Sequence, residues 1–158
     1  YFLDLDDGSY TRNPINIGAP VKGSVAIDPR GIPMLYVGQG LNTVHGKKVK
    51  IGYRIYNLFN QENLYFINGV DGFAYRKWGA FDSTPLVDKK NDKLYICGEN
   101  GLFYSVDLNT IYSLEDKRLS VEPKLTKYRY KINGNSHQGI ENSVAAYKNL
   151  IYFADNGG

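Results

Sequence analysis

The stretch KLYICGENGLFYSVDLNT, residues 93–110, decides the fold class of this chain. Its first half alternates aliphatic residues with Tyr95, which is the pattern of a strand with one buried face. Glu99-Asn100-Gly101 then supplies residues that accept a positive φ at a tight turn, and a second strand-like run follows over 102–108. The stretch therefore predicts an antiparallel β-hairpin.

The hairpin signature recurs along the chain with a nearly constant spacing. An aliphatic-Tyr-apolar triplet followed by small or polar residues occurs three times, and its tyrosines lie 59 and 57 residues apart: Tyr36, Tyr95 and Tyr152. The segment that leads into each hairpin begins with a hydroxyl residue, at intervals of 60 and 59 residues: Ser24, Thr84 and Ser143. Two anchors with one period indicate a structural repeat with long loops.

Composition favours an all-β protein. Aromatic residues make up 14% of the 158 residues, with 14 Tyr, and there are 17 Gly. This bias is typical of strands and tight turns, and the sequence shows no clear amphipathic helix. The single cysteine, Cys97, falls within a predicted strand, so we expect a buried small apolar side chain there.

Charge and hydropathy argue against a nucleic-acid partner and against a membrane span. The chain has 19 basic and 16 acidic residues, a balance that does not supply the phosphate-neutralising surface of a nucleic-acid binder. Its one basic cluster, KKVK at 47–50, is interpreted as a solvated loop. No apolar stretch approaches the roughly 18 residues of a membrane span. We therefore expect neither a nucleic-acid partner nor a membrane span.

Each period can be divided into four strands. In the first repeat we expect strands at 24–27, 34–38, roughly 49–58 and 73–78. In the second we expect them at 84–87, 94–97, 102–108 and roughly 124–132. Four antiparallel strands per repeat, arranged radially, form the blade of a β-propeller.

The two ends of the chain fall inside repeats. The first residues match the third strand of the second repeat, since Tyr1, Leu3, Asp4 and Leu5 correspond to Tyr104, Val106, Asp107 and Leu108. We therefore expect one incomplete propeller of about three blades, divided into the end of a blade at 1–17, blades at 21–79 and 82–132, and the first half of a blade at 140–158. Closed propellers have about four to eight blades. The chain is thus expected either to be a piece of a longer propeller or to complete a ring with other chains.

These residues resemble a known family. The run from Trp78 to Val87, WGAFDSTPLV, is similar to the entry into a blade of the PQQ-like (quinoprotein-type) β-propeller repeats. The following LYI at 94–96 and NGLFYSVD at 100–107 are similar to the next two strands of such a blade. The resemblance covers essentially the whole chain and is weakest over 41–68. It implies a propeller fold and, because family members often occur in exported or cell-surface proteins, an extracytoplasmic location.

Candidate site residues come from the loops on one face of a propeller. Lys22, Asp82 and Glu141 occupy the same position in three repeats, two residues before the hydroxyl residue that begins the first strand, and are candidates for a binding ring at the mouth of the channel. His137, in the long loop before Asn142, is a second candidate. With His45 as the other histidine, no metal site with recognisable spacing can be assembled.

The function that these observations favour is a non-catalytic binding or scaffolding module for a protein or glycan partner, with no cofactor. Two alternatives stay open. The chain could be part of a PQQ-dependent dehydrogenase with calcium, to which Asp82 and Glu141 would contribute carboxylates, although no adjacent-Cys pair is present to stack on the quinone. It could also belong to an envelope-assembly propeller that docks peptide segments, with strand addition as one mode.

Overall fold

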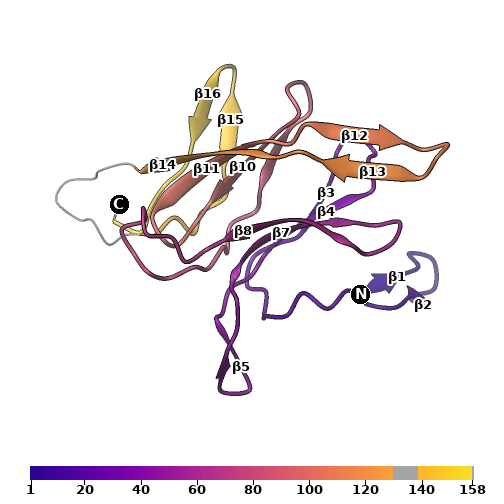
Figure 1. The fold of residues 1–158 in the computed structure, drawn as a ribbon, viewed down its shortest axis with the longest axis horizontal. Coiled ribbons are helices and arrows are strands. Elements are labelled where there is room, and N and C mark those ends of the chain that lie inside the picture. Colours follow the sequence, from indigo (N-terminus) through magenta and orange to yellow (C-terminus); the bar gives the residue numbers. More distant parts are fainter. Residues whose placement is uncertain (130–138, 158) are drawn as a thin grey trace.

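A computed structural model describes residues 1–129 and 139–157 and shows an all-β protein with no helix in these ranges. Two four-stranded antiparallel sheets form its centre (Figure 1). The first has the order β3-β4-β7-β8, with bounds Ala26–Ile27, Met34–Gly38, Gly52–Asn57 and Asn63–Asn68. The second has the order β9-β10-β11-β14, with bounds Leu86–Asp88, Lys93–Cys97, Leu102–Asp107 and Lys124–Arg129. The all-β prediction is confirmed.

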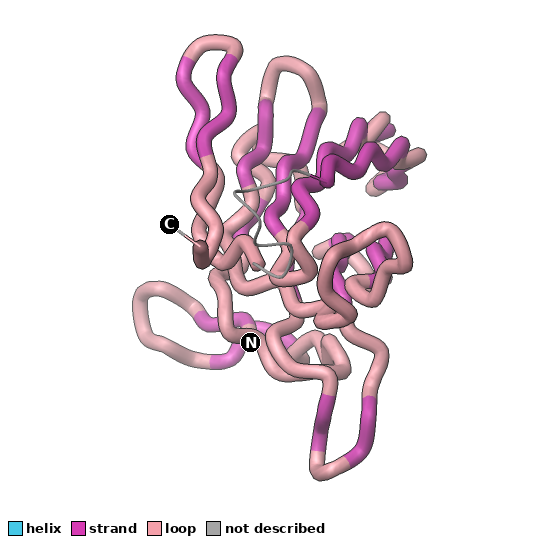
Figure 2. The backbone as a smooth tube through the Cα atoms, turned by 90° about the vertical axis from the view of Figure 1, so that its left-hand side faces the viewer, coloured by secondary structure: helices cyan, strands magenta, loops and turns pink. Residues whose placement is uncertain are grey.

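The remaining strands form two-stranded sheets. They are β1-β2 (Phe2–Leu3, Tyr10–Arg12), β5-β6 (Thr43–Val44, Lys47–Lys48), β12-β13 (Thr110–Ser113, Arg118–Val121) and β15-β16 (Ala145–Tyr147, Leu150–Tyr152). The hairpins β5-β6 and β12-β13 are insertions within the first and second four-stranded sheets, and Figure 2 shows hairpins projecting from the centre of the molecule. The β1-β2 pair, the two large sheets and the β15-β16 hairpin follow one another in chain order across the molecule (Figure 1). No helix of the described part is long and apolar enough to cross a membrane.

The register between the first two strands is the same in all three repeats. The repeated tyrosine lies opposite the residue two after the hydroxyl anchor, in the pairs Ala26–Tyr36, Leu86–Tyr95 and Ala145–Tyr152. A shift of one residue would turn every side chain to the other face of its sheet. The common register therefore gives equivalent residues of the three repeats the same orientation.

The main core lies between the two four-stranded sheets. Met34, Tyr36, Tyr53 and Ile55 of the first sheet face Leu94, Ile96, Tyr104 and Val106 of the second, and all eight are fully buried. The ring of Phe81 lies between the layers, with its centroid 5.6 Å from that of Tyr53 and 5.3 Å from that of Tyr104. Edge-on and tilted aromatic contacts of this kind add to the stabilisation from burial.

A second, smaller core lies on the other face of the second sheet, against the β15-β16 hairpin. Cys97, Phe103 and Ile140 are buried in it, and Tyr95 and Ile151 pack against it. Burial raises the pKa of the Cys97 thiol to about 12, so the thiol stays protonated. The prediction that Cys97 is a buried apolar side chain is confirmed.

The structure corrects the position of the fourth strand of the first repeat. The expected strand at 73–78 is wrong: the pairing strand is β8, and 73–78 consists of turns and bends. Side-chain oxygens of Asn68 and Asp71 accept hydrogen bonds from the backbone N–H groups two residues later (3.2 and 2.8 Å), which favours turns over a ladder. The segment 73–78 packs instead against the second sheet, where the guanidinium of Arg129 lies over the ring of Phe73.

Other boundaries differ less. The first strands of the two sheets begin two residues later than expected, and the described part of the last expected strand ends at Arg129, with 130–132 outside the described residues. KKVK at 47–50 was expected to be a solvated loop; Lys47 and Lys48 are exposed but form the short strand β6. The described residues show separate antiparallel sheets and no closed ring or barrel.

Candidate functional site

One backbone hydrogen bond occurs at the same place in all three repeats. The N–H group four residues after the repeated tyrosine donates to a carbonyl four residues before the hydroxyl anchor: Gly40 to Pro20 (2.8 Å), Glu99 to Ala80 (3.0 Å) and Asn156 to Gly139 (3.1 Å). Each bond holds the turn after the second strand against the segment that enters the same repeat. No single sequence motif predicts this hydrogen bond, because it joins two loops of each repeat.

A second backbone hydrogen bond joins one repeat to the next. Phe81 donates to Gln39 (3.0 Å), and Ile140 donates to Gly98 (3.1 Å), again at equivalent positions. The turn of one repeat is thus held between its own entry segment and the entry segment of the following repeat. The entry segments and turns alternate along one side of the molecule.

Six positions form a polar row along this side: Lys22, Gly40, Asp82, Glu99, Glu141 and Asn156. A Cβ atom added to Gly40 would lie 2.6 Å from Cγ of Lys22 and 2.8 Å from Oδ1 of Asp82, so both side chains lie directly against Gly40. Farther along, Asp82 lies against Glu99, and the amide of Asn156 donates to Oε1 of Glu141 (2.7 Å). The sequence repeat therefore places Lys22, Asp82 and Glu141 in a common row.

Glu99 is the buried member of the polar row. Glu99 is 6% exposed, and its carboxyl group shares a hydrogen bond with Asp82. Burial, this hydrogen bond and the negative charges of Asp82 and Glu141 raise the pKa of Glu99 to about 7, and a hydrogen bond from Trp78 offsets part of the rise. Two neighbouring carboxyl groups cannot both ionise freely in a site with little water, so Glu99 keeps its proton to a higher pH than an exposed glutamate does.

The other members of the row are more accessible. Lys22 and Glu141 are exposed, and Asp82 is partly buried. Oδ1 of Asp82 is buried, and no hydrogen-bond partner for it is present among the described residues. The row thus offers one cation at one end and carboxylate and amide oxygens at the other, which suits a ligand that donates several hydrogen bonds.

Sequence analysis found three of the six members of the row and missed the other three, among them the buried Glu99. Glu99 was explained by turn geometry alone, although it occupies the repeat position of Gly40 and Asn156, and that alignment was the signal that could have revealed it. Asp82 and Glu141 could alternatively have paired with Arg76 or Arg129, but no ion pair of this kind occurs in residues 1–129 and 139–157. The remaining candidate, His137, lies outside the described residues.

The quinoprotein resemblance raises the question of a calcium site among the described residues. Calcium takes six to eight oxygen ligands, whereas no group of three His, Cys, Asp or Glu side chains in the described ranges is arranged to hold a metal ion. The carboxyl groups of Asp82 and Glu99 lie against each other, and the pKa of Glu99 is raised to about 7. His45 lies in the exposed turn of the β5-β6 hairpin.

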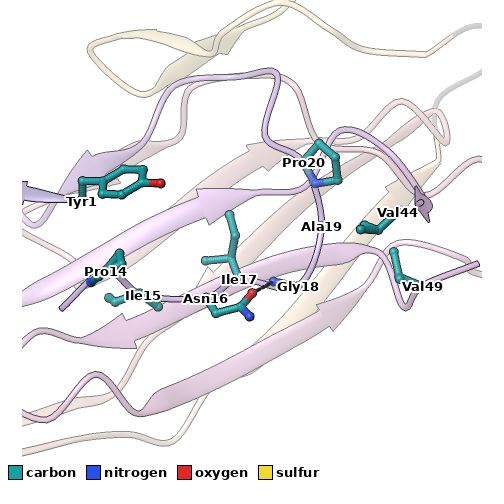
Figure 3. Close-up of a pocket in the computed structure, with 10 residues that line it drawn as sticks. All are labelled: Tyr1, Pro14, Ile15, Asn16, Ile17, Gly18, Ala19, Pro20, Val44 and Val49. Carbon is teal, nitrogen blue, oxygen red and sulfur yellow. Dashed lines mark hydrogen bonds between the residues drawn. The ribbon is translucent and has the colours of Figure 1, made fainter. Parts of the chain in front are cut away.

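A hollow of about 570 Å³ adjoins one end of the row but differs from it in chemistry (Figure 3). It is lined mainly by apolar residues of segment 14–20, with Tyr1 and the side chains of Val44 and Val49. Its one amide side chain, Asn16, accepts a hydrogen bond from the N–H of Gly18 (2.9 Å) within the same segment. The hollow carries no charged lining residue, so the polar row remains the candidate site.

Comparison of the chain with family models, with curated proteins and with solved structures found no match.

Proposed function

We propose that this chain is part of a β-propeller of the PQQ-like type and acts as a non-catalytic binding or scaffolding module for a protein or glycan. The observation that carries the proposal is the backbone hydrogen bond that recurs from Gly40, Glu99 and Asn156. Antiparallel sheets that repeat with one register and one inter-loop bond are the arrangement that radial stacking produces. Their loops on one side then present equivalent residues around a common rim.

The polar row is the proposed binding surface. Its exposed Lys22 and Glu141 and its partly buried Asp82 stand on turns that are fixed by backbone bonds within and between repeats. Fixed loops on a rigid scaffold lose little conformational entropy on binding. The oxygen-rich part of the row suits the hydroxyl groups of a glycan or the N–H groups of a protein loop.

The scaffolding role is supported by apolar surface on both outer layers. Val25 and Ile27 are exposed on the outer face of the first sheet, and Tyr147, Leu150 and Tyr152 are exposed on the β15-β16 hairpin. Contiguous exposed apolar groups mark surfaces that pack against further protein. Association with further blades, in the same or another chain, is therefore part of the proposal, and an extracytoplasmic location follows from the family resemblance alone.

The alternatives differ in what they require of the site. A PQQ-dependent dehydrogenase would need calcium and a carboxylate base beside the quinone, for which Asp82, Glu99 and Glu141 are the carboxyl groups of the row. An envelope-assembly propeller would dock peptides by strand addition, for which the edge strands β3 and β16 of the described sheets are suitable.

Glycan and peptide arrays test the proposal. We expect the 158-residue chain to bind a defined set of glycans or peptides, and Asp82→Asn/Glu141→Gln to lose that binding by tenfold or more. The matched control is Glu115→Gln/Asp116→Asn, which removes the same charge from exposed residues between β12 and β13. No ligand for the wild-type chain, or equal loss in the control, would contradict a binding function at the row.

A further inference from the structure

One loop of the first repeat carries a hairpin that the second repeat lacks. The connection between β4 and β7 spans residues 39–51 and contains β5-β6, whereas the equivalent connection between β10 and β11 consists of residues 98–101. Figure 1 shows β5 in a hairpin that projects away from the two large sheets. None of the residues 43–48 belongs to either of the described hydrophobic cores. The fold does not need this insertion for its core, and loops of this kind are where binding sites are added to a scaffold.

The hairpin lies in the most basic part of the chain. Residues 8–61 contain seven basic residues and one acidic residue, Asp28, whereas the rest of the chain contains 12 basic and 15 acidic residues. Lys22, Lys47 and Lys48 are exposed, and none of them takes part in an ion pair with the residues that the structure describes. Asp28 is buried and already bonded to Arg30. The positive charge of the three lysines is therefore not neutralised by any acidic residue of their own segment.

An apolar hollow adjoins the hairpin, as Figure 3 shows. Val44 and Val49 of the hairpin line one side of the hollow, and Ile15 and Ile17 of segment 14–20 line the other. Val44 is paired with Lys47 across the hairpin, and directly opposed residues of a hairpin have their side chains on the same face. Lys47 therefore lies on the face of the hairpin that borders the hollow.

Lys22 lies at a second edge of the hollow. Pro20 lines the hollow, and its carbonyl accepts the hydrogen bond from Gly40 (2.8 Å). Lys22 follows two residues later, and its Cγ lies 2.6 Å from the place that a Cβ atom on Gly40 would take. The hollow thus has apolar walls and exposed ammonium groups at its edges. Such a surface is complementary to a ligand that combines negative charge with apolar groups.

We propose that the β5-β6 hairpin and segment 14–20 form a docking site for an acidic protein segment, which places an apolar side chain in the hollow between them. The exposed lysines attract the segment over a distance and speed its association. Burial of the apolar side chain against Val44 and Val49 then stabilises the complex. The site goes beyond the polar row, because it uses none of the carboxyl groups of the row and adjoins it only at Lys22.

A protein segment fits this surface better than other anionic partners do. Nucleic-acid bases stack on aromatic side chains, and the hollow has one aromatic residue, Tyr1, in its lining. Surfaces that bind lipid bury apolar groups in the membrane, whereas the apolar groups of this surface line a recess. An anionic glycan matches the charge of the lysines but brings no apolar side chain for the hollow.

Fluorescence polarisation with short labelled peptides tests the proposal. We use one peptide with acidic and apolar residues, one with the same acidic residues and serine in place of the apolar ones, and one with lysine in place of the acidic ones. The 158-residue chain is expected to bind the first most tightly, and this binding is expected to weaken as salt is added because exposed charges are screened. Heparin, single-stranded DNA and phosphatidylglycerol vesicles serve as competing anions.

Two variants of the hairpin separate charge from apolar contact. Lys47→Gln/Lys48→Gln is expected to weaken binding of the first peptide about tenfold, and Val44→Asn is expected to weaken it as well because it makes the wall of the hollow polar. The matched control, Lys89→Gln/Lys90→Gln, removes the same charge from exposed residues of the turn between β9 and β10. Thermal unfolding checks that all variants fold, as we expect for changes outside both cores.

The outcomes separate this inference from the proposed function. Tightest binding of the acidic and apolar peptide, with losses in the hairpin variants alone, supports the inference. It is overturned by a lack of peptide binding at low salt, by equal loss in the control, or by tighter binding of heparin, DNA or vesicles. Asp82→Asn/Glu141→Gln must keep its affinity for the peptide, and a loss there also overturns the inference. If the polar row has no ligand and the hairpin binds the peptide, the proposed function at the row fails and this inference stands.

Discussion

The carboxyl group of Glu99 lies against that of Asp82, although 17 residues separate them and they belong to a turn and to an entry segment. Glu99 is buried, and its raised pKa of about 7 means that the folded protein holds a proton that the unfolded chain releases above about pH 4.5. Folded protein therefore binds more protons than unfolded protein between these values, and the linkage relation makes stability fall as pH rises.

The first prediction concerns this pH dependence. Glu99→Gln keeps the shape and the hydrogen-bonding capacity of the protonated side chain but cannot ionise. We expect the wild type to lose up to about 3 kcal/mol of unfolding free energy between pH 4.5 and pH 8, since one pKa unit corresponds to about 1.4 kcal/mol. The variant should lack this loss in urea titrations at both pH values. Identical pH profiles for the two proteins would show that Glu99 is ionised in the fold.

The second prediction concerns an ion pair between the two large sheets. Arg30 donates to Asp28 (2.7 Å) in its own turn and to Asp92 in the turn between β9 and β10. Burial acts to raise the pKa of Asp28, but hydrogen bonds from Arg30 and Tyr36 outweigh it and lower that pKa. The side chain of Asp28 is fully buried, so removal of Arg30 leaves an uncompensated carboxylate.

We expect Arg30→Leu to lower the free energy of unfolding by about 3–5 kcal/mol, the cost of breaking a buried pair by removing one partner. Lys93→Leu is the matched control, because it also replaces a cation by leucine but breaks a pair with Asp107 that is about one-third exposed on both sides. That change should cost far less, because water screens the charges of an exposed pair. Equal losses of unfolding free energy in urea would mean that the ion pairs of Arg30 stabilise the fold no more than the exposed pair of Lys93 does.

The third prediction concerns close backbone contact near the polar row. Gly69 follows β8, its carbonyl accepts a hydrogen bond from Asn100 (2.8 Å), and a Cβ atom at Gly69 would lie 1.9 Å from the carbonyl oxygen of Gly79. Because both groups are backbone, Gly69→Ala requires the segment to move, and we expect a loss of about 1–3 kcal/mol. Gly72→Ala, where no atom lies within 4 Å, is the control and should be nearly neutral. Thermal unfolding of the two variants compares them directly.

The sequence predicted most of the strands for a physical reason. Alternation around Tyr36 and Tyr95 fixes which face is buried, and β4 was placed with its observed bounds, Met34–Gly38. The fourth strand of the first repeat was misplaced because 73–78 contains as many aromatic and aliphatic residues as 63–68, and local turns at Asp71 decide between them.

The candidate site was predictable only in part. The period of the repeat aligned Asp82 with Glu141, and the structure places both in the polar row. The role of Glu99 depends on a carboxyl group from another loop and on burial by the next repeat, neither of which a local pattern contains.

The last prediction concerns the outer face of the first sheet. Ile27 is 54% exposed there, whereas its equivalent in the second repeat, Val87, packs against the main core. In the proposed propeller this face packs against a further blade, in the same or another chain. Ile27→Lys should then change the free energy of unfolding by no more than about 0.5 kcal/mol per isolated chain, but weaken self-association at least about tenfold because it buries an unpaired charge at the junction.

Leu114→Lys is the matched control. It also replaces an apolar residue by lysine, but at a position that is 68% exposed beyond β12 and outside the repeat contacts, so it should leave self-association unchanged. Sedimentation velocity over a concentration series measures both variants. Loss of association in the Leu114 variant as well would indicate non-specific charge repulsion, and association of the Ile27 variant at wild-type strength would show that this face stays in solvent.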